Sequence, residues 1–162
     1  MSSDEIRIRE ALADDRQAVA AIAQEVVDDG RVFVFEAVSD AIDYWYSPGG
    51  HVFVAVRDGE TLGTYVVKPN QKGRGAHVAN VGYMVRKSAR GLCVGTAMGA
   101  HSLDAARALG FRAIQFNMVV ATNAGAIRVW EKLGFETVGR LPGVFRHPDL
   151  GYVDALVMFR PL

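Results

Sequence analysis

Several stretches of the chain carry hydrophobic patterns typical of β-strands. "IRIREA" near the N-terminus alternates apolar and charged positions, as a strand with one buried face does. "HVFVAV" and "TLGTYVV" flank the turn "RDGE", whose Asp58-Gly59 pair suits the positive φ angles of a tight hairpin. "RAIQFNMVVA" is apolar almost throughout, which indicates a buried strand. The pattern therefore predicts a hairpin in the first half of the chain and a buried strand in the second.

Helical periodicity separates these strands. Asp14 and Gln17 stand three residues apart and predict a helix start of the capping-box type. The apolar face of this helix is then formed by Val19, Ile22, Ala23 and Val26. A shorter helix is predicted from near Ser39 to the breaker "SPGG". One side of it carries Ile42, Trp45 and Tyr46.

A strand, helix, strand succession occupies the middle of the chain. A strand over residues 77–85 leads through the loop "SARGLCVGTAMG" into a helix that ends at Gly110, which suits a left-handed cap. The apolar positions of this helix are Val94, Met98, Ala105 and Leu109. Because "RAIQFNMVVA" follows, the succession predicts a right-handed crossover between parallel strands. Asn123 then predicts the start of a last helix, which "LGF" ends before the strands "FETVGRL" and "YVDALVMF".

These elements predict an α/β fold of the α+β kind, with a mixed sheet of six or seven strands and about four helices. The 162 residues, half of them hydrophobic, suffice for one core, so we expect a single domain over residues 1–162. The net charge is zero without a basic block, which argues against a nucleic-acid partner. A lone Cys93, a charged N-terminal segment and the lack of a long apolar run favour a cytoplasmic protein without a membrane partner.

The loop before the central helix has the residues of an anion site. A helix N-terminus exposes unpaired N–H groups and a partial positive charge. Gly91 and Gly95 permit close approach of the backbone, and the amides from about Leu92 to Thr96, with Arg90, are expected to cradle phosphate oxygens. The loop lacks the Gly-Lys-Ser/Thr ending of the Walker motif and the third glycine of the Rossmann motif. A glycine-rich turn for tight helix packing is the alternative.

Two motifs together resemble the GCN5-related N-acetyltransferase (GNAT) family. "RGLCVGTA" is similar to the phosphate loop of that family, with Arg90 opening the motif, and "NAGAIRVWEKLGF" is similar to its second signature. The resemblance implies acetyl-coenzyme A as co-substrate and central parallel strands that splay apart. No metal is expected, because the histidines lack the spacing of metal ligands. The resemblance also implies a set of cofactor-binding residues, namely Tyr83, Met84, Val85, Arg90, Gly91, Leu92, Cys93, Val94, Gly95, Thr96, Asn123, Ala126 and Trp130.

Trp130 departs from the pattern of many family members, which carry a tyrosine there as the acid that reprotonates the leaving thiolate. An indole N–H does not titrate near neutral pH, so Trp130 is interpreted as a packing or acyl-binding wall. Catalysis is then expected to rest on positioning the amine and polarising the thioester carbonyl through a backbone N–H near Met84. Cys93 and the four histidines show no triad or metal-ligand spacing.

Three asparagines are the candidate catalytic residues. Asn80, Asn117 and Asn123 are expected to converge where the strands part, with Asn117 in the middle of a buried strand. A structural role for Asn117, satisfying backbone groups at the splay, is the alternative. The surrounding segments resemble the subgroup that acetylates proline analogues such as azetidine-2-carboxylate, and neighbouring small-molecule acetyltransferases.

Candidate acceptor-binding residues lie outside the two motifs. Glu36 follows the first helix, and Arg146 and Tyr152 are placed on the loop between the last two strands, where they are expected to meet an acceptor carboxylate; solvent-exposed turns are the alternative. The sequence thus predicts an acetyl-coenzyme A-dependent N-acetyltransferase of a small amine, such as an amino acid or analogue. A protein N-terminal or lysine acetyltransferase and a non-catalytic acyl-coenzyme A sensor stay open, as does a homodimer.

Overall fold

Seven β-strands form one mixed sheet in the computed structural model, which describes residues 5–162. The order across the sheet is β1-β2-β3-β4-β5-β7-β6, and among these neighbours only β4 and β5 run parallel. This arrangement confirms the predicted mixed sheet and the parallel crossover. The strands are β1 (Arg7–Glu10), β2 (His51–Arg57), β3 (Glu60–Pro69), β4 (Val78–Val85), β5 (Ala113–Val120), β6 (Glu136–His147) and β7 (Gly151–Pro161).

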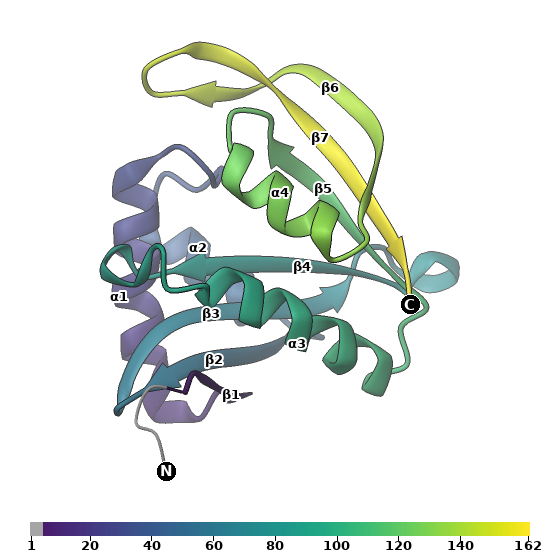
Figure 1. The fold of residues 1–162 in the computed structure, drawn as a ribbon. Coiled ribbons are helices and arrows are strands. Elements are labelled where there is room, and N and C mark those ends of the chain that lie inside the picture. The colour runs from purple at the N-terminus through teal and green to yellow at the C-terminus, as the bar shows by residue number, and fades with distance from the viewer. Residues whose placement is uncertain (1–4) are drawn as a thin grey trace.

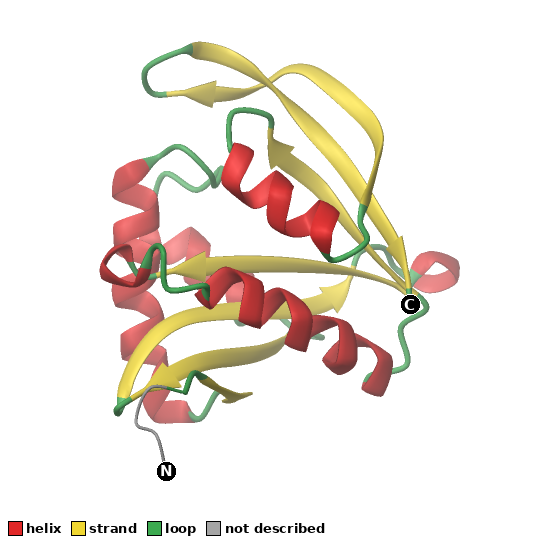
Figure 2. Ribbon diagram, in the orientation of Figure 1, coloured by secondary structure: helices red, strands yellow, loops and turns green. Residues whose placement is uncertain are grey.

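Helices cover both faces of the sheet (Figures 1 and 2). The helices α1 (Arg16–Asp29) and α2 (Val38–Trp45) pack on one face, and α3 (Val94–Ala108) and α4 (Ala124–Lys132) pack on the other. Each pair encloses its own apolar cluster, because neighbouring residues of a strand point to opposite faces. Short 3-10 turns lie at Ala13–Asp15, Gly73–Gly75 and Lys87–Ala89.

Local turn and cap signals are confirmed. Asp58 and Gly59 have φ angles of 51° and 79° and connect β2 to β3. Gly110 and Gly134 follow α3 and α4 with φ angles of 87° and 89°. The expected apolar face of α1 is buried, at Val19, Ile22, Ala23 and Val26.

Three sequence-based details are wrong. A capping box of Asp14 and Gln17 is absent from α1; Asp15 instead accepts hydrogen bonds from the Leu12 N–H and from Arg9, both at 2.6 Å. The strand β5 is not buried along its whole length, because Asn117 and Met118 are exposed where it departs from β4. Arg146 and Tyr152 belong to β6 and β7 rather than to a loop, and they lie opposite each other in the register of these strands.

Gly99 allows α3 and α4 to approach each other. A Cβ atom at this position would lie 2.6 Å from Leu133 Cδ1 and 2.9 Å from Trp130 Cζ3. Gly99→Ala is therefore expected to lower the free energy of unfolding by about 1–3 kcal/mol, the usual cost of overpacking. The measurement is urea denaturation. Gly125→Ala in α4 is the control, because its Cβ atom meets nothing within 4 Å and alanine favours a helix; equal stability of both variants would contradict the close approach.

Candidate active site

A gap opens between the two parallel strands at the centre of the sheet. The backbone pairing of β4 with β5 is limited to Val78 with Ala113 and Ala79 with Ile114. Both strands continue well beyond this point, β4 to Val85 and β5 to Val120. In Figure 1 they leave a common end and diverge. On its other edge β4 stays paired with β3 as far as Val85, so the edge that faces the gap has no strand partner.

The helix α3 begins beyond the open end of this gap. Gly91 and Cys93 have φ angles of 81° and 60°, and together they turn the chain into the helix. The first backbone bond of the helix runs from the Ala97 N–H to the Cys93 carbonyl at 3.0 Å. The N–H groups of residues 93–96 have no acceptor within residues 5–162, as expected at a helix N-terminus. The Leu92 N–H, in contrast, already donates to the Ala89 carbonyl at 3.2 Å.

Two further features of this loop bear on anion binding. A Cβ atom on Gly95 would meet nothing within 4 Å, so the space beside the first turn of α3 is open. The exposed Arg90 guanidinium lies 4.0 Å from the Asp29 carboxylate at the end of α1. Asp29 therefore partly neutralises the charge of Arg90. The free N–H groups at the start of α3 have no such partner in the part of the chain that the structure describes, and they are the main candidates for binding an anion.

The three candidate asparagines have separate hydrogen-bond partners. Asn80 accepts from the Tyr44 hydroxyl at 2.9 Å and donates to the Gln115 carbonyl at 3.0 Å, directly beyond the last backbone pair of β4 and β5. Asn117 donates to Asn70 Oδ1 at 2.7 Å and accepts from the Gln115 amide at 3.0 Å.

Asn123 accepts from the Ala126 N–H at 3.3 Å and caps α4, as the sequence predicted. Gln115 thus links Asn80 to Asn117, whereas Asn123 is bonded to neither of them. The structure brings two of the three asparagines into one polar network beside the gap.

Trp130 closes an aromatic cluster beneath the gap. Its side chain is buried, and its ring centroid lies 4.6 Å from Tyr83 and 4.9 Å from Phe116. The Ser102 hydroxyl donates to the Gly99 carbonyl, so the Tyr83 hydroxyl, 2.7 Å from Ser102, is the donor of that bond. Burial raises the pKa of Tyr83, which keeps the phenol neutral.

The remaining predicted cofactor residues follow the strand geometry. Met84 is buried against the α1 and α2 side, whereas Tyr83 and Val85 pack with the α3 and α4 side. Cys93 is free and exposed, and Ala126 lies on the first turn of α4. Within the described part of the chain no three acidic, His or Cys side chains gather as a metal site would require.

Ion pairs connect the loop between α1 and α2 with the hairpin of β6 and β7. Glu36 pairs with Arg146, and Arg31 pairs with Asp149 at 2.8 Å. Of the three candidate acceptor-binding residues, Glu36 and Arg146 therefore lie together. Tyr152, opposite Arg146 on β7, is 76% exposed.

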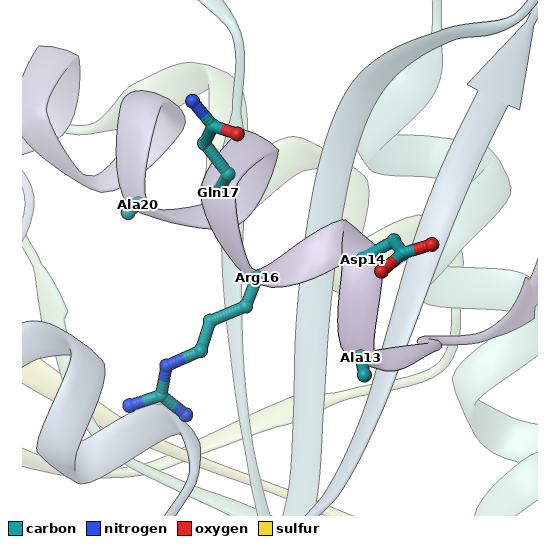
Figure 3. A pocket seen from close by; sticks show the side chains of 5 residues that line it. All are labelled: Ala13, Asp14, Arg16, Gln17 and Ala20. Carbon is teal, nitrogen blue, oxygen red and sulfur yellow. The ribbon is translucent and has the colours of Figure 1, made fainter.

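Two residues beside the gap were missed by the sequence analysis. Tyr44 of α2 reaches Asn80, and Lys68 of β3 lies opposite Asn80 with its ammonium 3.0 Å from the centroid of the Tyr44 ring. Neither belongs to a motif. A hollow at the start of α1, in contrast, is lined by side chains that do not converge, with Asp14 and Arg16 pointing apart (Figure 3).

The comparisons with known proteins agree with this geometry. A profile described as "Acetyltransferase (GNAT) family" matches residues 16–135, which include the gap and both helices on the α3 side. The chain belongs to the GNAT acetyltransferase family. This confirms the resemblance of the two sequence motifs to the family, and the predicted fold with it. None of the helices within residues 5–162 has both the length and the apolar character that a membrane crossing requires.

Several members of the GNAT family are similar to the chain in sequence or structure. It is 37% identical over 114 residues to the N-acetyltransferase aca1 of Schizosaccharomyces pombe; the match covers 68% of the chain and 54% of that relative, so the chain spans about half its length. A GCN5-related N-acetyltransferase from Kribbella flavida superposes with a TM-score of 0.92, at 39% identity and with 99% and 100% of the two chains covered. A ribosomal-protein-alanine N-acetyltransferase from Brucella melitensis gives 0.84, at 26% identity and with 96% and 99% covered.

Proposed function

We propose that this GNAT protein transfers an acetyl group from acetyl-coenzyme A directly to the amine of a small molecule. The observation that carries the proposal is the separation of β4 from β5 after Ala79 and Ile114, with the free amides of α3 beyond the open end. A slot between two strands suits an extended arm, and a helix N-terminus suits a diphosphate. Acetyl-coenzyme A has both parts, and a fold relative at 20% identity, yncA of Salmonella typhimurium, has a structure with this cofactor.

The residues present fit the cofactor. The N–H groups of residues 93–96 would bind its phosphate oxygens, the open space at Gly95 would admit them, and Arg90 would add charge. The unpaired edge of β4 at Tyr83, Met84 and Val85 would hydrogen-bond the pantetheine arm as an added strand does. When bound, acetyl-coenzyme A supplies the acetyl group as an activated thioester.

Positioning and polarisation supply the chemistry in this proposal. Holding an amine against the thioester turns a bimolecular encounter into an oriented one, which is worth up to about 7–11 kcal/mol of the barrier. An N–H of the free β4 edge would polarise the acetyl carbonyl. The indole of Trp130 cannot serve as an acid, and the Tyr83 hydroxyl already donates to Ser102. The proton balance therefore falls to the amine itself and to water.

Two features favour a small acceptor over a protein. The ion pairs of Glu36 with Arg146 and of Arg31 with Asp149 join the α1–α2 loop to the β6–β7 hairpin, which narrows the approach for a folded chain. The polar network of Asn80, Gln115 and Asn117 is only a few side chains wide and suits a molecule with a few polar groups. The likeness to the Brucella ribosomal-protein-alanine N-acetyltransferase favours a protein N-terminus as the second candidate acceptor.

A thiol-release assay tests these candidates. The protein is incubated with acetyl-coenzyme A and one acceptor at a time: amino acids, proline, azetidine-2-carboxylate, small alkylamines, and peptides with N-terminal alanine or internal lysine. We expect acceptor-dependent thiol release with one or more small amines. Release with peptides alone would replace the proposed acceptor, and coenzyme A binding without any release would indicate a sensor rather than an enzyme.

Trp130→Phe tests the absence of an acid on α4. Phenylalanine keeps an aromatic ring against Tyr83 and Phe116, so turnover at saturating substrate should stay near that of the wild type. Loss of a true general acid would instead lower kcat by roughly 10²–10⁴-fold. Phe135→Leu, which trims the same aromatic cluster, controls for packing effects. A large fall in kcat for Trp130→Phe alone, with unchanged melting temperature, would show that the indole takes part in the reaction.

A further inference from the structure

Lys68 places a positive charge on the sheet face that carries the polar network. Its ammonium donates to the Tyr44 carbonyl at 3.1 Å and to Ser47 Oγ at 3.2 Å, and it lies over the Tyr44 ring. All three partners are neutral. Lys68 forms no ion pair within residues 5–162, and burial lowers its pKa to about 8 without an acid to offset the effect. The ammonium is mostly protonated at pH 7 and has no counterion among the residues that the structure describes.

The Lys68 side chain lies near the closed end of the gap, where the backbone pairing of β4 with β5 stops. Lys68 and Asn80 are paired in the register of β3 and β4, and neighbouring strands are about 4.8 Å apart. Tyr44, whose ring lies beside the Lys68 ammonium, donates a hydrogen bond from its hydroxyl to Asn80. The Asn80 amide in turn donates to the Gln115 carbonyl on β5. A row of polar groups therefore leads from the ammonium to the point where β4 and β5 part.

The two arginines at the contact between the α1–α2 loop and the β6–β7 hairpin already have acidic partners. Arg146 is paired with Glu36, and Arg31 is paired with Asp29 and Asp149. The charge of Glu36 is neutralised by Arg146 in the same ion pair. Glu36 is therefore not free to attract a polycationic amine. The charges favour an acceptor that carries a negative group beside its amine, and they favour Lys68 over Arg146 as its counterion.

We propose that Lys68 binds the carboxylate of an amino-carboxylate acceptor, whose amine then lies in the gap between β4 and β5. The inference rests on the proposed acetyltransferase function and names the substrate class of the same site. Tyr44 and Asn80 act as positioning residues, because the Tyr44 ring covers the ammonium and its hydroxyl fixes the Asn80 amide. Two of the three N–H donors of the ammonium are used by the Tyr44 carbonyl and Ser47 Oγ. A carboxylate bound at Lys68 would accept the third.

Acceptor pairs of similar shape that differ in the charge of one group test this inference. Because the carboxamide makes the nearby amine a weaker base, kcat/KM is compared per unprotonated amine. Alanine, β-alanine, 4-aminobutyrate and 6-aminohexanoate are each compared with the corresponding carboxamide in the thiol-release assay. For one or more pairs, wild-type kcat/KM should favour the acid by about 10- to 100-fold, the worth of a charged hydrogen bond. The preferred spacer length then reports the distance from Lys68 to the reacting amine.

Substitutions at Lys68 assign the preference to this side chain. Lys68→Met should lower kcat/KM of the acid by about 10- to 100-fold and that of the carboxamide much less, so that the preference for the acid is lost while the affinity for coenzyme A is kept. Lys68→Arg should keep part of the preference. Ser47→Ala removes a partner of the ammonium but not its charge, so it controls for lost stability at the end of α2, and Lys72→Met on the exposed loop controls for net charge.

The outcomes separate this inference from the proposed function. Turnover of carboxamides with no preference for any acid, or a preference that survives in Lys68→Met, would overturn the role of Lys68 and leave the acetyltransferase proposal standing. Absence of turnover with every amine would overturn the proposed function and this inference with it. Equal loss of preference in Ser47→Ala and Lys68→Met would assign the effect to the fold of α2 rather than to the charge.

Discussion

Gly95→Glu is expected to weaken coenzyme A binding by at least 100-fold and to leave the fold intact. The side chain would extend into the open space beside the first turn of α3, where the phosphates are proposed to bind, so it would occupy their volume and repel their charge. Like charges brought together cost several kcal/mol, and each 1.4 kcal/mol is about tenfold in affinity. Because the new Cβ atom would meet no part of residues 5–162 within 4 Å outside its own turn of α3, melting should change little. Isothermal titration calorimetry measures the affinity.

Gly125→Glu is the matched control for this substitution. Gly125 is the second residue of α4, as Gly95 is of α3, and its Cβ atom would also meet nothing within 4 Å. The two variants therefore add the same charge at the same position of a helix, and only Gly95→Glu should lose coenzyme A. Normal binding by a folded Gly95→Glu protein would remove the N-terminus of α3 from the proposed site.

Asn117→Ala is expected to lower kcat by about 10²-fold, with nearly unchanged affinity for coenzyme A and melting temperature. The side chain lies on the part of β5 that has left β4, and a polar group aimed at developing charge has effects of this size. Its partners Asn70 and Gln115 are side chains, and the network around Asn117 is exposed. Removing the amide therefore costs the fold little. Steady-state kinetics and melting curves on the same preparation measure both effects.

Asn70→Ala separates positioning from chemistry at this site. It removes the acceptor of the Asn117 amide but keeps Asn117 itself, so a loss smaller than that of Asn117→Ala is expected. Asn123→Ala is a less direct test, because it also removes the cap of α4, at about 1 kcal/mol of stability. Normal turnover by Asn117→Ala would assign the amide to the surface and remove Asn117 from the candidate catalytic residues.

Fold features that depend on neighbouring residues could be predicted from the sequence. The Asp58-Gly59 turn, the glycine after α3 and the Asn123 cap each act within a few residues, so their signals are complete in a short segment. The start of α1 shows the limit of such signals. Asp14 and Gln17 have the spacing of a capping box, but Arg9 of β1 binds Asp15, and a 3-10 turn forms ahead of the helix instead.

The polar side of the candidate site could be predicted only in part. The two family motifs indicated the β4 edge and the loop before α3, but the exposure of Asn117 follows from the separation of two strands, which a local pattern does not encode. Lys68 and Tyr44 are 24 residues apart and come from a strand and a helix that carry no motif. Their contact depends on how α2 packs on the sheet, so it becomes visible only in three dimensions.

The ion pairs between the α1–α2 loop and the β6–β7 hairpin make one wall of the acceptor side sensitive to ionic strength. Both pairs are exposed, and such pairs contribute about 0–1 kcal/mol each. The loop is anchored by Val32, Phe33 and Phe35, which pack against the core cluster of α1 and α2, so raised salt weakens only its contact with the hairpin. At physiological salt, where screening acts over about 8 Å, the two ion pairs hold this wall only weakly. Asp29 pairs both with Arg31 of this wall and with Arg90 of the loop before α3, so a change of ionic strength is expected to affect the acceptor side and the phosphate side of the site together.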